Sequence, residues 1–228
     1  MQFHSLVASL LLGLLLVVLL FSVRVPVPLA ATARNVPAMT KTVYFAGPLF
    51  TFQDIAGNEI LCDKIHQVSS GRYRCILPQN FPEQQQKMPL MLRNRDLQAL
   101  LSADAIVANF NGLELDSGTV VEVMMSNFAD MPSVLLRTDY RRGEEGWNLM
   151  ASYYPRTEIV QIDALDQYRI DRGNWDLAAT SIAQRIVEAL DRVTSTPPLL
   201  KQDRKVIVDH WLHELLHTPG PAPKPRIR

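Results

Sequence analysis

One stretch near the middle of the chain constrains the fold more than any other, because it reads as a strand, a loop and a helix start in succession. Residues 105–108 are a short apolar run after a polar segment, as a buried strand would be. Asn111-Gly112 is a turn dipeptide, and residues 116–119 can cap the helix that follows. In an open parallel sheet, ligands bind at the carboxyl ends of the strands. The stretch therefore predicts a ligand site that includes the carboxylates of Asp116 and Glu122, although on spacing alone Asp116 could simply cap the helix and Glu122 complement its dipole.

Strands and helices alternate along the central part of the chain. A polar loop between prolines at 80–89 separates a strand from a helix. Such alternation implies a parallel sheet that is covered on both faces. The predicted fold class is α/β, a doubly wound, mostly parallel five-stranded sheet of the flavodoxin or Rossmann type with helices on both faces. The predicted strands are 42–45, 73–77, 105–108, 133–137 and 158–162, and the predicted helices include 52–68, 90–102 and 175–193.

The two ends of the chain lie outside this pattern. A continuous apolar run from Leu6 to Val23 lies in a hydrophobic segment, residues 1–24, and is long enough to span a membrane. Residues 25–40 form a Pro-containing linker to the domain at 41–194. Residues 195–228 add an amphipathic helix, expected at 199–217, and a basic Pro-rich tail expected to be disordered. The helix is expected to pack on the domain or on a neighbouring subunit.

Three interpretations of the apolar segment are open. A signal peptide with a cleavage site at residues 31–33 would export the domain. An uncleaved anchor would hold the domain at the membrane, on the cytoplasmic side by the positive-inside rule, because Arg24, Arg34 and Lys41 follow the run and no Lys or Arg precedes it. Translation from Met39 would remove the segment and leave the domain in the cytoplasm. The charge distribution favours the anchor.

Charge and cysteine content argue against two kinds of partner. Lys plus Arg and Asp plus Glu are 23 each, so no basic stripe is available to neutralise a nucleic acid. Cys62 and Cys75 lack the spacing of metal ligands and are expected to be buried thiols, although they could form a disulfide if the domain is exported.

His210, His213 and His217 share a helical face, but no carboxylate motif accompanies them, so we predict solvent-facing histidines. No metal or other cofactor is predicted.

Five short motifs follow one another in the part of the chain between Lys41 and Ile162. They are residues 41–50, 77–79, 94–96, 116–122 and 148–150. Together and in this order, they resemble the motifs of the nucleoside 2-deoxyribosyltransferase family. The resemblance implies an enzyme that transfers a 2-deoxyribosyl group between nucleobases, with a deoxyribonucleoside and a free nucleobase as its substrates.

The resemblance assigns the catalytic roles to four residues. Glu122 aligns with the nucleophile, and a carboxylate suits this role because it forms a glycosyl ester that a second base can attack. We expect Glu122 in the first turn of its helix, where the dipole would keep it ionised. Asp116 aligns with a carboxylate that hydrogen-bonds the sugar, Asp96 with the Asp that handles the proton of the base, and Tyr44 with a tyrosine beside the nucleophile.

The same resemblance assigns four residues to substrate binding. Gln79 matches a residue that contacts the base, and its amide can both donate and accept hydrogen bonds. Asn148 matches an Asn that reaches the sugar from a neighbouring subunit, which implies a homo-oligomer with shared active sites. Gly47 and Gly118, in the first and fourth motifs, complete the set. Met124 departs from the family, which commonly has Gly there, and this predicts looser packing of the helix on the sheet or a larger cavity beside the site.

Two other functions are open. A nucleoside or deoxynucleotide N-glycosidase on the same fold would share the catalytic Glu and use water as the acceptor. For a phosphorylated substrate, Ser117 and Thr119 could supply hydroxyls, but the sequence places no Arg at this loop. A non-catalytic, membrane-tethered nucleoside-binding domain is the alternative from another class. A pure binder would have no need to retain all four of the catalytic residues together.

Overall fold

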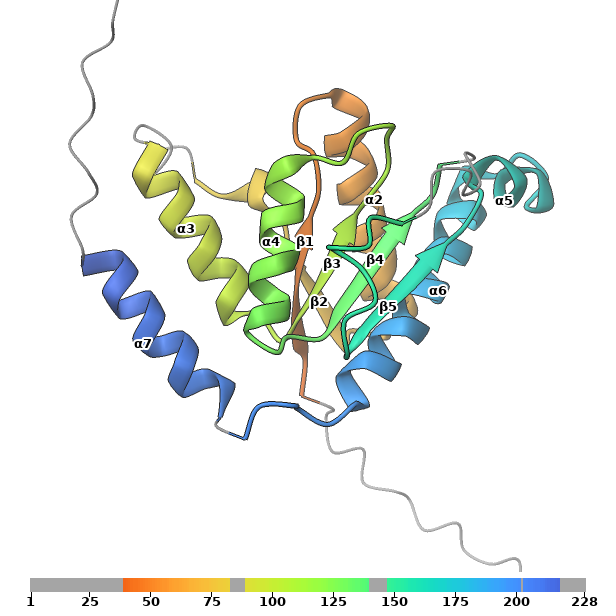
Figure 1. Ribbon diagram of the computed structural model, residues 1–228. Helices are drawn as coiled ribbons and strands as arrows, with labels where there is room; N and C mark the ends of the chain where they lie inside the picture. The colour runs from red at the N-terminus through yellow and green to blue at the C-terminus, as the bar shows by residue number, and fades with distance from the viewer. Residues whose placement is uncertain (1–38, 83–88, 140–146, 202, 218–228) are drawn as a thin grey trace, which may run out of the picture. The chain divides into compact units, whose positions relative to one another are not determined.

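The computed structural model describes residues 39–82, 89–139, 147–201 and 203–217 (Figure 1). The apolar segment, most of the linker and the C-terminal tail, for which the sequence makes predictions, lie outside these residues. Within the described ranges, no helix is both long and apolar enough to cross a membrane.

The centre of the domain is a five-stranded sheet whose strands are all parallel, in the order β2-β1-β3-β4-β5. From β1 the chain passes to β2 on one side and then returns to β3 on the other, so the direction of winding reverses between β1 and β3. The loops after these two strands therefore diverge, which in such sheets creates the ligand-binding crevice. The strands are β1 (Lys41–Ala46), β2 (Tyr73–Ile76), β3 (Ala105–Asn109), β4 (Ser133–Arg137) and β5 (Thr157–Gln161).

Helices cover both faces of this sheet, so the predicted doubly wound fold class is confirmed. Helices α2 and α6 pack on one face and α3 and α4 on the other (Figure 1). Within β1, Val43 and Phe45 enter the first layer, whereas Tyr44 enters the second. This alternation follows from the two-residue period of a strand. The helices are α2 (Phe52–Val68), α3 (Pro89–Ser102), α4 (Ser117–Phe128), α5 (Ala164–Ile170), α6 (Trp175–Ser195) and α7 (Arg204–His217), with a short 3₁₀ turn, η1 (Pro78–Asn80).

The structure departs from the predicted elements mainly after β2 and near the C-terminus. The 3₁₀ turn η1 and the helix α5 were not predicted. Helix α7 begins at Arg204 rather than near Leu199, because the backbone N–H groups of Leu199 and Leu200 donate to Asp130 Oδ2 at 2.7 and 3.0 Å. These bonds hold the preceding chain outside the helix.

The C-terminal helix packs on the domain, as one of the two predicted arrangements requires. Val208 and Leu212 of α7 are buried against Leu101 of α3 and Ala129 at the end of α4. His210 and His213, on the same helix, are exposed. The part of the chain that the structure describes contains no group of three or more side chains arranged to hold a metal ion.

The two cysteines lie together in the α2/α6 layer as free thiols. Cys62 is 5% exposed, and Cys75 is partly buried against it. Burial raises the pKa of the Cys62 thiol, and the neighbouring Cys75 thiol raises it further. Cys62 therefore stays protonated at neutral pH, which fits the predicted buried thiol.

Candidate active site

Tyr44 and Glu122 form the centre of the candidate site. Tyr44 is fully buried in the α3/α4 layer, and Glu122 of α4 is partly buried. The Tyr44 hydroxyl donates to Glu122 Oε1 at 2.6 Å. A strand and a helix that are far apart in the sequence therefore meet at one short, charge-assisted hydrogen bond.

The acidity of Glu122 is strongly perturbed by this environment. Burial raises the pKa of Glu122 to about 7, Asp96 and Asp116 contribute in the same direction, and the hydrogen bond from Tyr44 opposes the increase. Burial and the neighbouring Glu122 raise the pKa of Tyr44, so its phenol remains protonated and acts as the donor. Near neutral pH, the Glu122 carboxyl is consequently divided between its acidic and ionised forms.

The expectation that a helix dipole keeps Glu122 ionised is wrong. Helix α4 begins at Ser117 and has no acidic residue in its first turn, so Glu122 lies in the second turn. The influence of the dipole falls off within the first turn. Burial, which the sequence alone did not reveal, therefore determines the pKa of Glu122.

Asp116 caps α4 and also contributes to the electrostatics of the site. Its Oδ2 accepts hydrogen bonds from the backbone N–H and the side-chain hydroxyl of Thr119, both at 2.7 Å. A Cβ at Gly118 would lie 3.2 Å from the same oxygen, so the absence of a side chain leaves room for this cap. The helix-cap interpretation and the proximity to Glu122 both hold for Asp116.

Asp96 reaches the site from α3 as part of an ion pair with its neighbour. Arg95 donates to Asp96 Oδ1 through Nη2 at 2.8 Å and Nε at 3.0 Å, and its guanidinium lies 4.4 Å from the centre of the Phe81 ring. The negative charge of Asp96 raises the pKa of both Glu122 and Tyr44. The sequence reasoning missed Arg95, although it belongs to the motif that contains Asp96.

Gln79 lies at the carboxyl edge of the sheet, in η1 directly after β2. Its strand is beside β1, where Ile76 pairs in register with Tyr44. Gln79 Nε2 donates to the backbone oxygen of Ile55 and to Glu59 Oε2, both at 3.0 Å. Of the two predicted abilities of this amide, to donate and to accept, only acceptance by Oε1 is left for a substrate, because Nε2 already donates to two protein groups. Glu59 had no signal in the sequence beyond its place on α2.

Gly47 lies where the loop after β1 passes close to the end of β3. A Cβ at this position would lie 3.1 Å from Asn109 Cβ and 3.4 Å from both amide atoms of Asn58. These contacts explain why a residue without a side chain suits the position. A direct contact of Gly47 with substrate stays a prediction.

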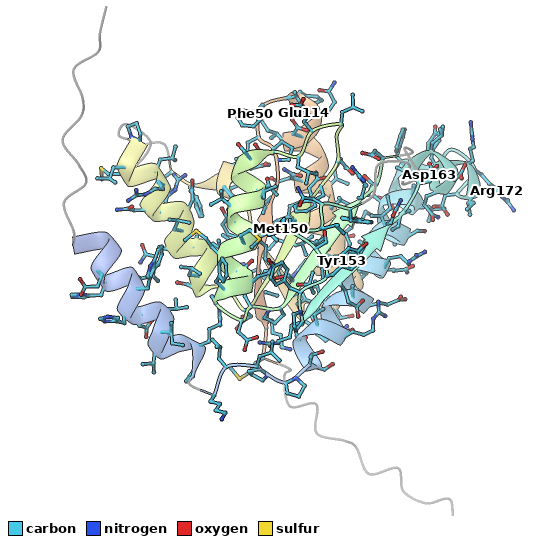
Figure 2. The ribbon with its side chains drawn as sticks, in the orientation of Figure 1. Phe50, Glu114, Met150, Tyr153, Asp163 and Arg172 are labelled. Atoms are coloured by element: carbon cyan, nitrogen blue, oxygen red, sulfur yellow. The ribbon has the colours of Figure 1, made fainter. Side chains whose placement is uncertain are left out.

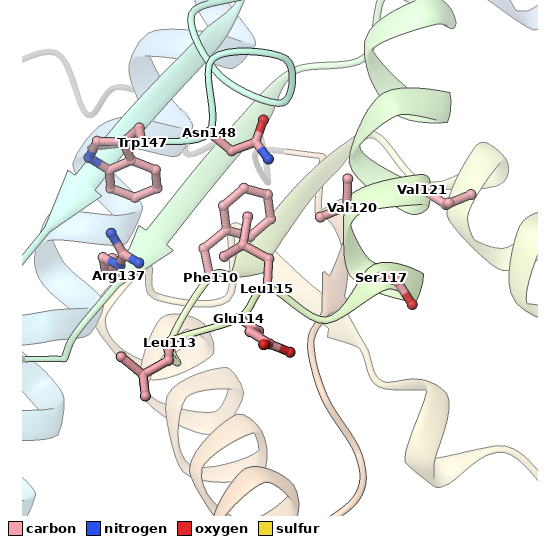
Figure 3. Close-up of a pocket in the computed structure, with 10 residues that line it drawn as sticks. All are labelled: Phe110, Leu113, Glu114, Leu115, Ser117, Val120, Val121, Arg137, Trp147 and Asn148. Atoms are coloured by element: carbon pink, nitrogen blue, oxygen red, sulfur yellow. The ribbon is translucent and has the colours of Figure 1, made fainter. Parts of the chain in front are cut away.

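A cavity of about 710 Å³ opens at the carboxyl edge of the sheet beside α4 (Figure 3). Phe110 and Trp147 form an aromatic pair in its wall, with ring centroids 6.2 Å apart, and the Arg137 guanidinium lies 5.6 Å from the centre of the Trp147 ring. The lining comprises Phe110, Leu113, Glu114, Leu115, Ser117, Val120, Val121, Arg137, Trp147 and Asn148.

Two residues in the lining of this cavity, Arg137 and Asn148, bear on the predictions made from the sequence. The loop itself contains no Arg, as the sequence shows, but Arg137, at the end of β4, lines the cavity together with Ser117. The sequence could not show the position of Arg137, because β4 and β3 are brought side by side by pairing in the sheet. Asn148 lines the cavity of its own chain, and its Oδ1 accepts from the Met150 backbone N–H at 3.0 Å. Sharing of Asn148 between subunits stays a prediction.

Met124 lies on α4 at a partly buried position, and its effect on the packing of the helix or on a neighbouring cavity stays a prediction. The buried residues of this helix are Thr119, Val123 and Ser126, whereas Met124 is only partly buried. The position at which the sequence departs from the family is therefore outside the most buried face of α4.

The fold and the site define a doubly wound α/β domain with a buried tyrosine–carboxylate pair at its ligand-binding edge. The family model for nucleoside 2-deoxyribosyltransferase matches residues 43–152. The matched span contains all eight predicted site residues, from Tyr44 to Asn148. The resemblance is therefore confirmed: this part of the chain matches the nucleoside 2-deoxyribosyltransferase family, whose members are enzymes.

Solved structures similar to this chain include three bacterial proteins. A conserved protein from Enterococcus faecalis V583 is 22% identical, with 67% of this chain and 98% of that chain covered and a TM-score of 0.45. A 2-deoxyribosyltransferase from Bacillus psychrosaccharolyticus is 18% identical, with 61% and 95% covered and a TM-score of 0.41. A CMP N-glycosidase from Clostridium botulinum is 17% identical, with 58% and 99% covered and a TM-score of 0.41. A search of curated proteins finds no match.

Proposed function

We propose that this protein transfers a 2-deoxyribosyl group from a deoxyribonucleoside to a free nucleobase through a covalent glycosyl-Glu122 intermediate. The observation that carries the proposal is the buried hydrogen bond from Tyr44 to Glu122, inside the span that matches the family. The perturbed pKa of Glu122 supports the assignment, since such shifts are concentrated at functional sites.

The contact with Tyr44 suggests which atom of Glu122 reacts. Tyr44 binds Oε1, so Oε2 attacks the anomeric carbon. The bond between this carbon and the base nitrogen breaks, its electron pair leaves with the base, and the base gains a proton, a step in which Asp96 takes part. The nitrogen of the second base then attacks the same carbon, releases the Glu122 carboxylate and loses its proton.

The surrounding charges favour formation of this intermediate. The ionised Glu122 lies in the field of Asp96 and Asp116, both of which raise its pKa. An ester is neutral, so conversion of the carboxylate to a glycosyl ester removes one of three neighbouring negative charges. Relief of like-charge repulsion therefore lowers the free energy of the intermediate relative to the ionised enzyme.

The cavity beside α4 favours a nucleoside over a nucleotide as the substrate. Arg137 is the cation in its lining, and Arg137 Nε lies 3.7 Å from Asp139 Oδ2. Glu114 adds a negative charge to the same lining. The described lining therefore has no surplus of positive charge for a 5′-phosphate, whereas Ser117 and Asn148 offer hydrogen bonds suited to an uncharged hydroxyl.

The proposal is tested by incubating the full-length protein with thymidine or deoxyinosine, with and without adenine, and separating the products by chromatography. We expect deoxyadenosine to form only when adenine is present. Glu122→Ala should abolish exchange, whereas Glu188→Ala, at an exposed position of α6, should not change it. Free deoxyribose and base without exchange would establish the N-glycosidase instead. Nucleoside binding without turnover would support the non-catalytic alternative.

We also propose that the active protein is a homo-oligomer with shared active sites. Leu149, Met150 and Tyr153 are 76%, 74% and 65% exposed and lie within five residues after Asn148. Figure 2 labels Met150 and Tyr153. Exposed apolar groups of this kind suit contact with a second copy of the chain. Light scattering should give a mass above that of the monomer, and Met150→Lys should reduce mass and activity together. A fully active monomer would contradict the proposal.

For the apolar segment from Leu6 to Val23, we propose a membrane anchor with the domain on the cytoplasmic side. The charge distribution of the sequence supports this proposal. Extraction of cell membranes with alkaline carbonate should leave the full-length protein in the pellet. A soluble protein that lacks its first residues would instead indicate cleavage near Ala33 or translation from Met39, which mass determination of the intact chain distinguishes.

A further inference from the structure

The amide of Gln79 is held in one orientation by α2. One acceptor is the backbone oxygen of Ile55 and the other is Glu59 Oε2, each 3.0 Å from Gln79 Nε2. An amide nitrogen carries two hydrogens, so these two bonds use both. Asn80 Nδ2 also lies 3.2 Å from Glu59 Oε2, which holds the Glu59 carboxylate against η1.

The opposite orientation of this amide is unfavourable. Rotation of the amide by a half-turn would place Gln79 Oε1 against the backbone oxygen of Ile55 and the Glu59 carboxylate, neither of which carries a hydrogen. The hydrogen-bond network therefore determines which end is oxygen, as such networks do for amides generally. Glu59 contributes the charged acceptor, which makes the stronger of the two contacts.

The oxygen of the same amide has no partner. Gln79 Oε1 is buried and accepts no hydrogen bond from any residue that the structure describes. A buried polar atom without a partner is unfavourable, and native proteins rarely leave one without a reason. A ligand that displaces the groups covering this oxygen and brings a donor to it would satisfy it.

We propose that Glu59 is a positioning residue that makes Gln79 an obligatory hydrogen-bond acceptor, so that the base site selects nucleobases with an N–H donor on the contacted edge. The exocyclic amino group of adenine is such a donor. The inference rests on the proposed function, because it takes Gln79 as the residue that contacts the base. It also assigns a role to Glu59, which lies outside the sequence motifs.

The test compares two acceptor bases of nearly the same shape, adenine and 6-methylpurine, with saturating thymidine and the full-length protein. The methyl group replaces the amino donor and leaves Gln79 Oε1 unpaired, so kcat/KM should be about tenfold or more lower for 6-methylpurine. Gln79→Leu removes the acceptor and should bring the ratio of the two kcat/KM values close to one.

The role of Glu59 is tested by variants of the same helix. Glu59→Ala frees the Gln79 amide to turn, so the KM for adenine should rise and the preference for adenine should fall severalfold with little change in kcat. Glu59→Gln retains an acceptor oxygen and should restore most of the preference. Asp63→Ala is the matched control, since Asp63 is an exposed carboxylate on α2.

Each outcome either supports or overturns the inference. Equal use of adenine and 6-methylpurine by the unmodified protein would show that Gln79 Oε1 does not meet a donor on the base. An unchanged preference in Glu59→Ala would show that Glu59 does not orient the amide. Failure of the proposed function is distinguishable, because the protein would then exchange neither base.

Discussion

Glu122 in the α3/α4 layer and the paired carboxylates around the α2/α6 layer lie in opposite electrostatic environments. Around the α2/α6 layer, acidic side chains meet cations: Arg72 pairs with Asp191, Lys64 with Asp176, and Arg192 with Glu158. In the α3/α4 layer, Arg95 pairs with Asp96, but Glu122 lies in the field of two further carboxylates, those of Asp96 and Asp116. Each layer has its own core of buried apolar side chains.

The pKa shifts in the two layers run in opposite directions. Arg72 lowers the pKa of Asp191, whereas burial raises the pKa of Glu122 to about 7. Pairing with a cation stabilises the ionised form, so the first layer gains stability from its charges at neutral pH. Burial among like charges destabilises the ionised form, so the second layer holds a carboxylate at a cost to stability. This contrast assigns support of the fold to one layer and chemistry to the other.

The largest effect is expected for Glu122→Gln, which should lower activity and raise the stability of the folded protein. Turnover should fall at least about a thousandfold, because an amide is not a nucleophile. The folded protein should become more stable above neutral pH, by about 1–3 kcal/mol, since the ionised Glu122 no longer has to be buried.

The sign of this change follows from proton binding. Between the ordinary pKa of 4.5 and the raised value of about 7, the folded state binds more protons at Glu122 than the unfolded state does. The contribution of Glu122 to stability therefore falls as pH rises through this interval. Thermal unfolding should show Glu122→Gln above the unmodified protein near about pH 8 and level with it near about pH 4. Glu188→Gln, on the exposed side of α6, is the control, and equal curves for all three proteins at both pH values would contradict the assignment.

A smaller effect is expected for Tyr44→Phe, which leaves the buried ring in place and removes one hydrogen bond. The value of kcat/KM for the unmodified enzyme should rise with pH through about 7, as Glu122 ionises. Because the Tyr44 hydrogen bond lowers the pKa of Glu122, its loss should move this rise to higher pH and reduce the rate about tenfold or more. If the pH profile of kcat/KM kept the same midpoint in Tyr44→Phe, Tyr44 would not influence the ionisation of Glu122.

Asp96→Asn should move the same midpoint in the other direction. Removal of a like charge lowers the pKa of Glu122, so the acid limb of kcat/KM should shift to lower pH. Asp63→Asn, which removes one negative charge from α2, is the matched control and should leave the midpoint in place. If both variants shifted the midpoint equally, the effect would come from the total charge of the protein and not from its local arrangement.

The order of strands and helices could be predicted because its signals are local. Apolar runs, turn dipeptides and capping residues lie within each element, and the bounds of α2, predicted at 52–68, agree with Phe52–Val68. Tyr44 and Glu122 could be proposed together because their motifs occur in order, and the structure brings them into contact.

What the sequence did not reveal depends on contacts between distant elements. Burial raises the pKa of Glu122, Tyr44 on β1 opposes the increase, and Asp96 on α3 adds to it. Arg137 reaches the cavity from β4, and Glu59 reaches Gln79 from α2. The start of α7 depends on Asp130, which lies 69 residues before Leu199. None of these contacts leaves a periodic or compositional signal.

The smallest expected effect completes the comparison of the two layers, with Asp191→Asn as the counterpart of Glu122→Gln. Arg72 lowers the pKa of Asp191, so the pair contributes stability above the ordinary pKa of the carboxyl, and this contribution is lost as pH falls through the lowered value. The side chains of Arg72 and Asp191 are 42% and 43% exposed, so solvent screening limits the contribution to less than about 1 kcal/mol. Asp191→Asn should therefore unfold at a slightly lower temperature at neutral pH, with a difference that shrinks in high salt and in acid. An increase in stability at neutral pH, as expected for Glu122→Gln, would show that the layers do not differ in the way their charges are arranged.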